Sequence, residues 1–208
     1  MKFIDNVQKG LLSFFNYPYV PKELLNNIKG PVIMHISDTP VDAYNYIFRL
    51  IDILKPKFII HTGDMVDNIK LEIHKNRINC YEKNVARLIE GLEKNESSKI
   101  YYVLGNHDDY DIVNKLTKKG IIIQEGPLKV DDHNLIVSHF FREHSCNTDF
   151  YLYGHSHEPG HVKQNGINSL NGVLNINIID MSNKNIFHVE YPIGTNSARG
   201  MGFKRIKL

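Results

Sequence analysis

The sequence predicts an α/β fold that contains two sheets. In the first half of the chain, apolar runs that end in polar residues, at 32–40, 58–64 and 100–108, alternate with segments of helical periodicity. From about residue 121 onward the pattern changes to short strands separated by turn residues. A βαβαβ half followed by a mostly β half indicates layered α and β elements rather than one doubly wound parallel sheet.

The first 30 residues are predicted to form a helical extension, 1–30, that packs on a domain spanning 31–208. Apolar residues recur at helical spacing between Phe3 and Phe15, and the sequence NYPYVP then ends the helix. Contact with a membrane surface or with another copy of the chain is the alternative role for this apolar face.

Each following element has its own local signal. Val32, Ile33, Met34 and Ile36 make an apolar run typical of a strand buried on both faces. Helical spacing of apolar residues predicts helices over about 43–54, 81–94 and 112–116. The later apolar runs predict strands within 120–124, 128–130, 134–140, 150–157, 173–180 and 186–192.

Composition gives general limits. The net charge of +2 favours no particular partner, and the basic residues Arg199, Lys204, Arg205 and Lys207 at the end of the chain are interpreted as a solvated tail. Two cysteines indicate a reducing, cytoplasmic setting. No apolar run reaches the roughly 20 residues that a membrane span needs, and the first 21 residues do not resemble a signal peptide.

Residues of metal-ligand and acid–base type collect where predicted strands end. They are Asp38, Gly63-Asp64, Gly105-Asn106-His107-Asp108, His139 and Gly154-His155-Ser156-His157. Ligands of open α/β sheets bind at the carboxyl ends of strands, and the glycines permit tight turns. Singly, these residues also suit helix caps, plain turns or chance pairs. Together, the carboxylate, amide and imidazole groups suit Mn²⁺, Fe²⁺, Zn²⁺ or Co²⁺.

The series resembles the calcineurin-like metallophosphoesterase superfamily, whose blocks appear here as SDTP, GDMVD, GNHD, SHF and GHSH between about residues 32 and 190. The resemblance implies a four-layer α/β/β/α sandwich of two mixed sheets flanked by helices. It also implies two divalent cations, Mn²⁺ foremost, with Fe²⁺, Zn²⁺, Ni²⁺ and Co²⁺ as alternatives. The chain is similar to the small members that lack a cap domain.

The resemblance also assigns ligands. One cation would be held by Asp38, Asp64 and His157, and the other by Asp64, Asn106, His139 and His155. Two such cations clamp phosphoryl oxygens and activate a bridging water, which attacks phosphorus as hydroxide. His107 would assist the leaving oxygen, and Asp67 would orient its imidazole; the alternative for Asp67 is an ordinary loop carboxylate.

The first block departs from the family pattern, because Pro40 stands where the family has a histidine ligand. We expect a helix to begin here, with Thr39 as N-cap and Asp42 in a capping box, or with Asp42 itself as N-cap. The first cation site is therefore expected to be weak. Direct metal binding by Asp42 is a less favoured alternative.

Other polar residues receive mostly structural interpretations. His35 and His61 lie within strands and are expected to be buried and hydrogen-bonded rather than ligands. His144 and His161 are expected at the surface, and Arg142 is left open between substrate contact and the surface.

The leading functional hypothesis is a metal-dependent phosphoesterase acting on a phosphorylated small-molecule or nucleotide substrate, a diester or a monoester. A nuclease is the second reading, although no basic track indicates nucleic acid. A non-catalytic interaction module on the same fold is the third. The sequence leaves a homo-oligomer open.

Overall fold

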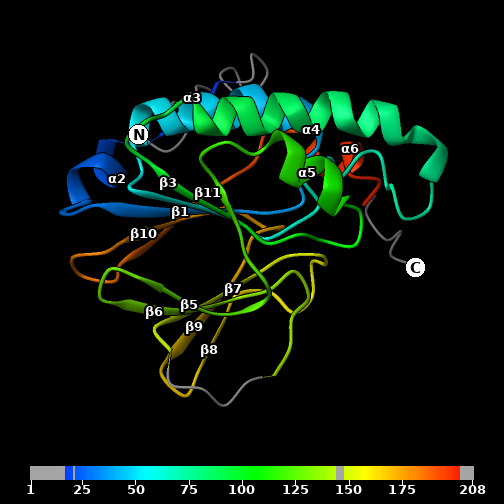
Figure 1. Cartoon of the computed structure of the whole chain (residues 1–208). Helices are drawn as coiled ribbons and strands as arrows, with labels where there is room; N and C mark the ends of the chain where they lie inside the picture. The colour runs from blue at the N-terminus through cyan, green and yellow to red at the C-terminus, as the bar shows by residue number, and fades with distance from the viewer. Residues whose placement is uncertain (1–16, 21, 144–147, 202–208) are drawn as a thin grey trace, which may run out of the picture.

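The computed structural model describes residues 17–20, 22–143 and 148–201 of the 208-residue chain. Its strands form two mixed sheets flanked by helices, which is the α/β class that the sequence predicts (Figure 1). The helix expected over residues 3–15 lies outside the described residues, as do His144, Cys146, Lys204, Arg205 and Lys207.

The first sheet has six strands in the order β11-β10-β1-β2-β3-β4. Their bounds are β1 Val32–Ile36, β2 Phe58–His61, β3 Lys99–Tyr102, β4 Ile121–Ile122, β10 Ile176–Asp180 and β11 Ile186–Val189. Strands β1 to β4 run parallel, whereas β10 is antiparallel to both of its neighbours. The parallel strands bring their carboxyl ends to one edge of the sheet.

The second sheet has five strands in the order β5-β6-β7-β9-β8. Their bounds are β5 Gly126–Val130, β6 His133–Val137, β7 Phe150–Tyr153, β8 Val162–Gln164 and β9 Ile167–Asn171. The sequence analysis missed the β8–β9 hairpin. Its signal was the pair Asn165-Gly166, which makes a two-residue turn with positive φ at both positions.

The described helices are α2 Lys22–Asn27, α3 Tyr44–Leu54, α4 Ile78–Glu93, α5 Tyr110–Leu116 and α6 Thr195–Ala198, with short 3₁₀ turns η1 Val41–Ala43 and η2 Lys75–Arg77. The three helices predicted in the first half are confirmed as α3, α4 and α5. Among the described residues, no helix has the length and apolar character needed to cross a bilayer.

The start of α3 differs from the prediction. Pro40 precedes the η1 turn in an extended conformation, Ala43 is the N-cap of α3, and neither makes a side-chain cap hydrogen bond. The Thr39 hydroxyl instead donates to the Met65 carbonyl at 3.1 Å and accepts from His61 Nε2 at 2.9 Å. The predicted Thr39 cap is therefore wrong, because His61 and Met65 compete successfully for its hydroxyl.

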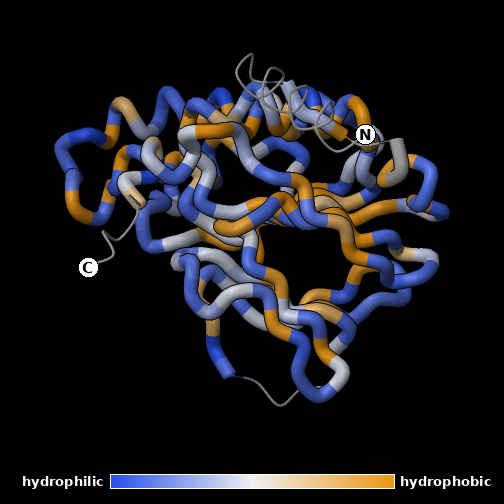
Figure 2. The backbone as a smooth tube through the Cα atoms, turned by 180° about the vertical axis from the view of Figure 1, so that it is seen from behind, coloured by the Kyte–Doolittle hydropathy of each residue, from blue (hydrophilic) through white to orange (hydrophobic). Residues whose placement is uncertain are grey.

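Alternation along β1 divides the core into two layers. Val32, Met34 and Ile36 pack among the helix-side residues, whereas Ile33 packs in the layer between the two sheets. All five residues of β1 are buried, as predicted for a central strand. In Figure 2 the hydrophobic stretches lie mostly in the interior strands, and the outer loops are mostly hydrophilic.

The described helices α3, α4 and α5 cover one face of the six-stranded sheet, and the five-stranded sheet covers the other (Figure 1). On β7, Phe150 and Leu152 face the inter-sheet layer, so Tyr151 and Tyr153 face outward. Phe141 packs on both tyrosine rings, with centroids 5.5 and 4.9 Å away. These three rings therefore pack together on the outer face of β7.

Candidate metal centre

Loops after five strands meet where the two sheets adjoin. Asp38 follows β1, Asp64 follows β2, Asn106 and His107 follow β3, His139 follows β6 and His155 follows β7. The His155 amide donates to Asp38 Oδ2 at 2.9 Å and so connects the second sheet to the first. The His107 amide donates to Asp64 Oδ1, also at 2.9 Å. The structure therefore brings together most of the residues that the sequence singled out.

The backbone of these loops is held in uncommon conformations. Asp38, Asp64 and His155 have φ values of 50°, 56° and 69°, in the left-handed region that non-glycine residues rarely adopt. Strained residues of this kind cluster at functional sites, where the surrounding structure must hold them. The glycines at 105 and 154 permit close approach, because a Cβ on them would collide with Asp64 Oδ1 and Ser37 Oγ respectively.

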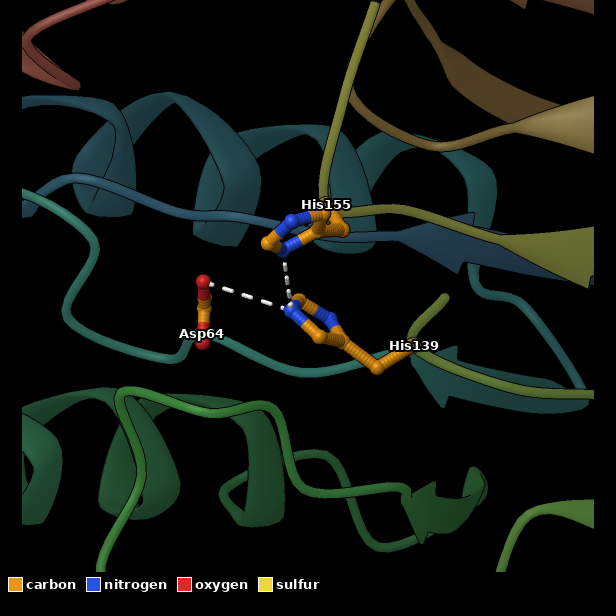
Figure 3. A group of neighbouring side chains, drawn as sticks. All are labelled: Asp64, His139 and His155. Atoms are coloured by element: carbon orange, nitrogen blue, oxygen red, sulfur yellow. Dashed lines mark hydrogen bonds and ion pairs between the residues drawn. The ribbon is translucent and has the colours of Figure 1, made fainter. Parts of the chain in front are cut away.

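Three ligand-type atoms lie around His139 Nε2. His139 Nε2 lies 3.2 Å from His155 Nδ1 and 3.4 Å from Asp64 Oδ2 (Figure 3). It also lies 3.0 Å from Asn106 Oδ1. Donor atoms at right angles around a cation, with bonds of about 2.1 Å, lie about 3 Å apart. The spacing therefore fits one coordination shell made by Asp64, Asn106, His139 and His155, the set implied for the second cation.

The surroundings orient these ligands. His139 Nδ1 donates to the Thr62 carbonyl at 2.8 Å, which leaves Nε2 to face the cluster, and the His139 amide donates to Glu125 Oε1 at 2.9 Å. Asn106 Nδ2 donates to Glu72 Oε2 at 2.6 Å, so its oxygen faces the cluster. Such outer contacts fix ligand geometry. Sequence reasoning missed Glu72, Glu125 and Thr62.

Asp64 and His139 form a buried pair that favours both charged forms. Burial opposes protonation of His139, but the hydrogen bond and the charge of Asp64, aided by Asp38, raise its pKa to about 9. Burial likewise opposes ionisation of Asp64, yet His139 and the His107 amide hold its pKa below the usual value. A bound cation would take the place of the imidazolium proton.

A second group of ligand-type atoms consists of Asp64, Asp67 and His107, all within 4.8 Å of one another. Asp67 pairs with Lys70, and its Oδ2 is buried without a hydrogen-bond partner among the described residues. Burial and the charge of Asp38 raise the Asp67 pKa to about 7. Asp67 thus lies near His107, but its carboxylate forms an ion pair with the Lys70 ammonium.

The ligands implied for the first cation do not form a group of neighbouring ligand atoms. Asp38 is fully buried; Oδ2 accepts from Ser37 Oγ at 2.5 Å and from His155, whereas Oδ1 has no partner in the described part of the chain. Burial and the nearby Asp64 charge raise the Asp38 pKa. His157 is half-buried and belongs to neither ligand group. A buried carboxylate oxygen without a partner is costly, and a divalent cation would supply one. The unpartnered oxygens of Asp38 and Asp67 therefore fit cation binding.

Asp108, the last residue of the GNHD block, has a structural role that the sequence did not reveal. Its carboxylate accepts from the amides of Asp64, Met65 and Gly105 at 2.8 to 2.9 Å and from the Tyr81 hydroxyl at 2.9 Å. Burial and the Asp64 charge raise its pKa to about 6. Asp108 therefore joins the turn after β2 to the turn after β3.

The remaining predicted residues have clear places. His35 bonds Thr62 and Asn177, and His61 bonds Thr39 and the Gly63 amide, so both are the buried, hydrogen-bonded histidines that the sequence predicts. Arg142 is exposed and pairs with Glu125 at 2.9 Å. His161 is half-buried, not superficial, and stacks on His188 with ring centroids 4.2 Å apart.

Two solved structures share this fold. An archaeal phosphodiesterase of known structure is 20% identical, with a TM-score of 0.53 over 76% of this chain and 99% of its own. Yfce, a phosphoesterase from E. coli, is 15% identical, with a TM-score of 0.51 over 77% of this chain and 99% of its own. At these identities the likeness concerns the fold.

A search among curated proteins found no match. The profile described as calcineurin-like phosphoesterase matches residues 31–159, more than half of the chain. This stretch contains the loops that carry Asp38, Asp64, Asn106, His139 and His155. The chain therefore belongs to the calcineurin-like phosphoesterase family.

Proposed function

We propose that the protein is a hydrolase that cleaves a phosphodiester or a phosphate monoester with the help of divalent cations, Mn²⁺ foremost. The carrying observation is the convergence of Asp64, Asn106, His139 and His155 around one point, with His107 beside it. When bound there, divalent cations supply Lewis-acid charge for the phosphoryl oxygens and activate water as the nucleophile.

The protein's own groups have distinct roles in this proposal. Asp64 would be shared by the two cation sites: its Oδ2 lies 3.4 Å from His139 Nε2 in one ligand set, and the family resemblance assigns it to the Asp38 set as well. His107 is buried, and burial lowers its pKa. The Asp64 charge acts to raise this pKa, and the Lys70 charge acts to lower it. In its protonated form it would donate a proton to the leaving oxygen, a step worth typically about 10²–10⁴-fold.

The proposal includes an unequal pair of cation sites. Pro40 is buried and offers no lone pair where the family has a histidine, and His157 lies outside both ligand groups. We therefore propose that the site at Asp38 binds its cation more weakly than the site at His139.

The experiment is an assay of purified protein, treated with chelator and then reloaded with Mn²⁺, Fe²⁺, Zn²⁺, Ni²⁺ or Co²⁺. Substrates are bis-p-nitrophenyl phosphate, p-nitrophenyl phosphate and a single-stranded oligonucleotide. Metal-dependent release of nitrophenol supports the proposal, and Asp64→Asn is the matched inactive control. Cleavage of the oligonucleotide alone would favour the nuclease alternative. Tight metal binding without hydrolysis of any substrate would favour a non-catalytic module.

A further inference from the structure

Arg199 is buried beneath the candidate metal centre. It directly follows α6, and only 1% of its surface is exposed, so its assignment to a solvated basic tail was wrong. Its guanidinium donates to four oxygens. They are the carbonyls of Asp38 at 2.6 Å, Val173 at 2.7 Å and Ser37 at 3.3 Å, and Asn196 Oδ1 at 3.1 Å.

Burial of the Arg199 charge costs free energy, so a residue of this kind is expected to have a specific role. A charge taken out of water needs close polar partners, and no carboxylate pairs with Arg199 within the described residues. Carbonyl dipoles and the Tyr191 ring, 4.4 Å from the guanidinium carbon, provide the compensation instead. An apolar side chain would fill the same space at lower cost if packing were the only requirement.

One of the carbonyls that Arg199 contacts belongs to Asp38, the residue whose backbone is strained, and another belongs to its neighbour Ser37. Asp38 has a φ of 50°, which determines where its carboxylate points. The Tyr191 hydroxyl supports the same segment, since it accepts from the Ser37 amide at 3.3 Å and lies 3.2 Å from the Ser37 carbonyl. Arg199 and Tyr191 thus both hold the backbone of the Ser37-Asp38 segment.

We infer that Arg199 is a positioning residue that holds the Asp38 backbone so that its carboxylate can take a cation. The inference rests on the proposed function, because it assumes that Asp38 is a metal ligand. Arg199 cannot itself be a ligand, since a guanidinium has no free lone pair. Because Pro40 supplies no imidazole, the weaker site depends more on Asp38, and therefore on the residue that orients it.

The test compares wild type, Arg199→Lys and Arg199→Gln in Mn²⁺ titrations by calorimetry. The contacts around a ligand are typically worth about 10–100-fold in metal affinity. We expect Arg199→Gln to weaken the weaker site by that factor and leave the tighter site unchanged. Arg199→Lys should give partial rescue, since an ammonium reaches fewer carbonyls than the guanidinium fork.

Val85→Ala is the control for general destabilisation, because Val85 is fully buried on α4 and belongs to neither ligand group. It should lower the melting temperature of the metal-free protein without changing either metal affinity. A loss of metal affinity in Val85→Ala equal to that in Arg199→Gln would overturn the inference. If Arg199→Gln fails to fold, the comparison of Arg199→Lys with Val85→Ala decides it.

Asp38→Asn completes a double-mutant cycle. If Arg199 acts through Asp38, Arg199→Gln should have no further effect on metal affinity in the Asp38→Asn background. An undiminished effect of Arg199→Gln in that background would overturn the inference. So would an Asp38→Asn variant whose metal affinities equal those of wild type. Failure of the proposed function looks different: wild type would then bind Mn²⁺ at two sites and hydrolyse no phosphate ester, while the Arg199 effect on affinity would remain.

Discussion

His139 donates a hydrogen bond from Nδ1 to the backbone carbonyl of Thr62 at 2.8 Å. This bond leaves Nε2 directed at Asp64 and His155 (Figure 3) and at Asn106, which is the arrangement that a metal-ligating imidazole requires. The carbonyl belongs to the residue after β2, and His139 follows β6, so one hydrogen bond aligns the two sheets at the site.

Metal binding should release a proton from His139. Its pKa is raised to about 9 in the metal-free protein, so Nε2 carries a proton at pH 6 to 8 that a cation must displace. The affinity for Mn²⁺ should therefore rise by about tenfold per pH unit for each proton released. Calorimetry in buffers of different ionisation enthalpy measures the proton count. An affinity that stays constant between pH 6 and 8 would contradict this assignment.

His107→Ala should lower turnover by about 10²–10⁴-fold, because it removes the proposed proton donor. Metal content by elemental analysis should stay near that of wild type, since Asn106 already lies in the ligand cluster. His74→Ala is a suitable control, because His74 is exposed. A variant that loses one cation would instead make His107 a ligand together with Asp64 and Asp67.

Pro40→His should tighten the weaker cation site by restoring an imidazole donor. The substitution is compatible with the backbone, because residue 40 has φ −74° and ψ 154°, an extended conformation open to histidine. Calorimetric titration of both proteins with Mn²⁺ measures the change. Two equally tight sites in the natural protein, unaffected by the substitution, would show that another residue supplies the missing ligand.

The histidine at position 35 should make the protein sensitive to acid. Burial lowers its pKa to about 3, and its Nδ1 accepts a hydrogen bond from the Asn177 amide that protonation would break. Above the unfolded pKa of 6.5 the ring is neutral in both the native and the unfolded state, so it does not make stability depend on pH. As the pH falls toward 3, the unfolded chain takes up a proton that the native state refuses, so stability declines.

His35→Gln tests this dependence. The variant should be less stable than wild type at pH 7, and the difference in unfolding free energy should narrow by about 2 kcal/mol between pH 7 and 5. Denaturant unfolding of the metal-free proteins at both pH values gives the comparison, with His74→Gln as the exposed control. A difference that is independent of pH would mean that His35 titrates normally in the native state.

The sequence by itself determined the elements and the residue types of the site. The apolar run at 32–36, the helical spacing over 43–54 and the polar residues after each strand are local patterns, and the structure confirms those elements. Parallel strands then necessarily bring residues such as Asp38 and Asp64 to one edge. The buried states of His35 and His61 also followed from their positions within strands.

Only the tertiary structure decided how those residues are held. Arg199 contacts the Asp38 carbonyl from 161 positions away, and His139 is oriented by the Thr62 carbonyl. Every residue has a backbone carbonyl, so the pattern of side chains does not predict which carbonyl will accept a hydrogen bond from a given donor. The sequence therefore specified the residue types of this candidate centre, whereas the path of the folded backbone specified the contacts that orient them.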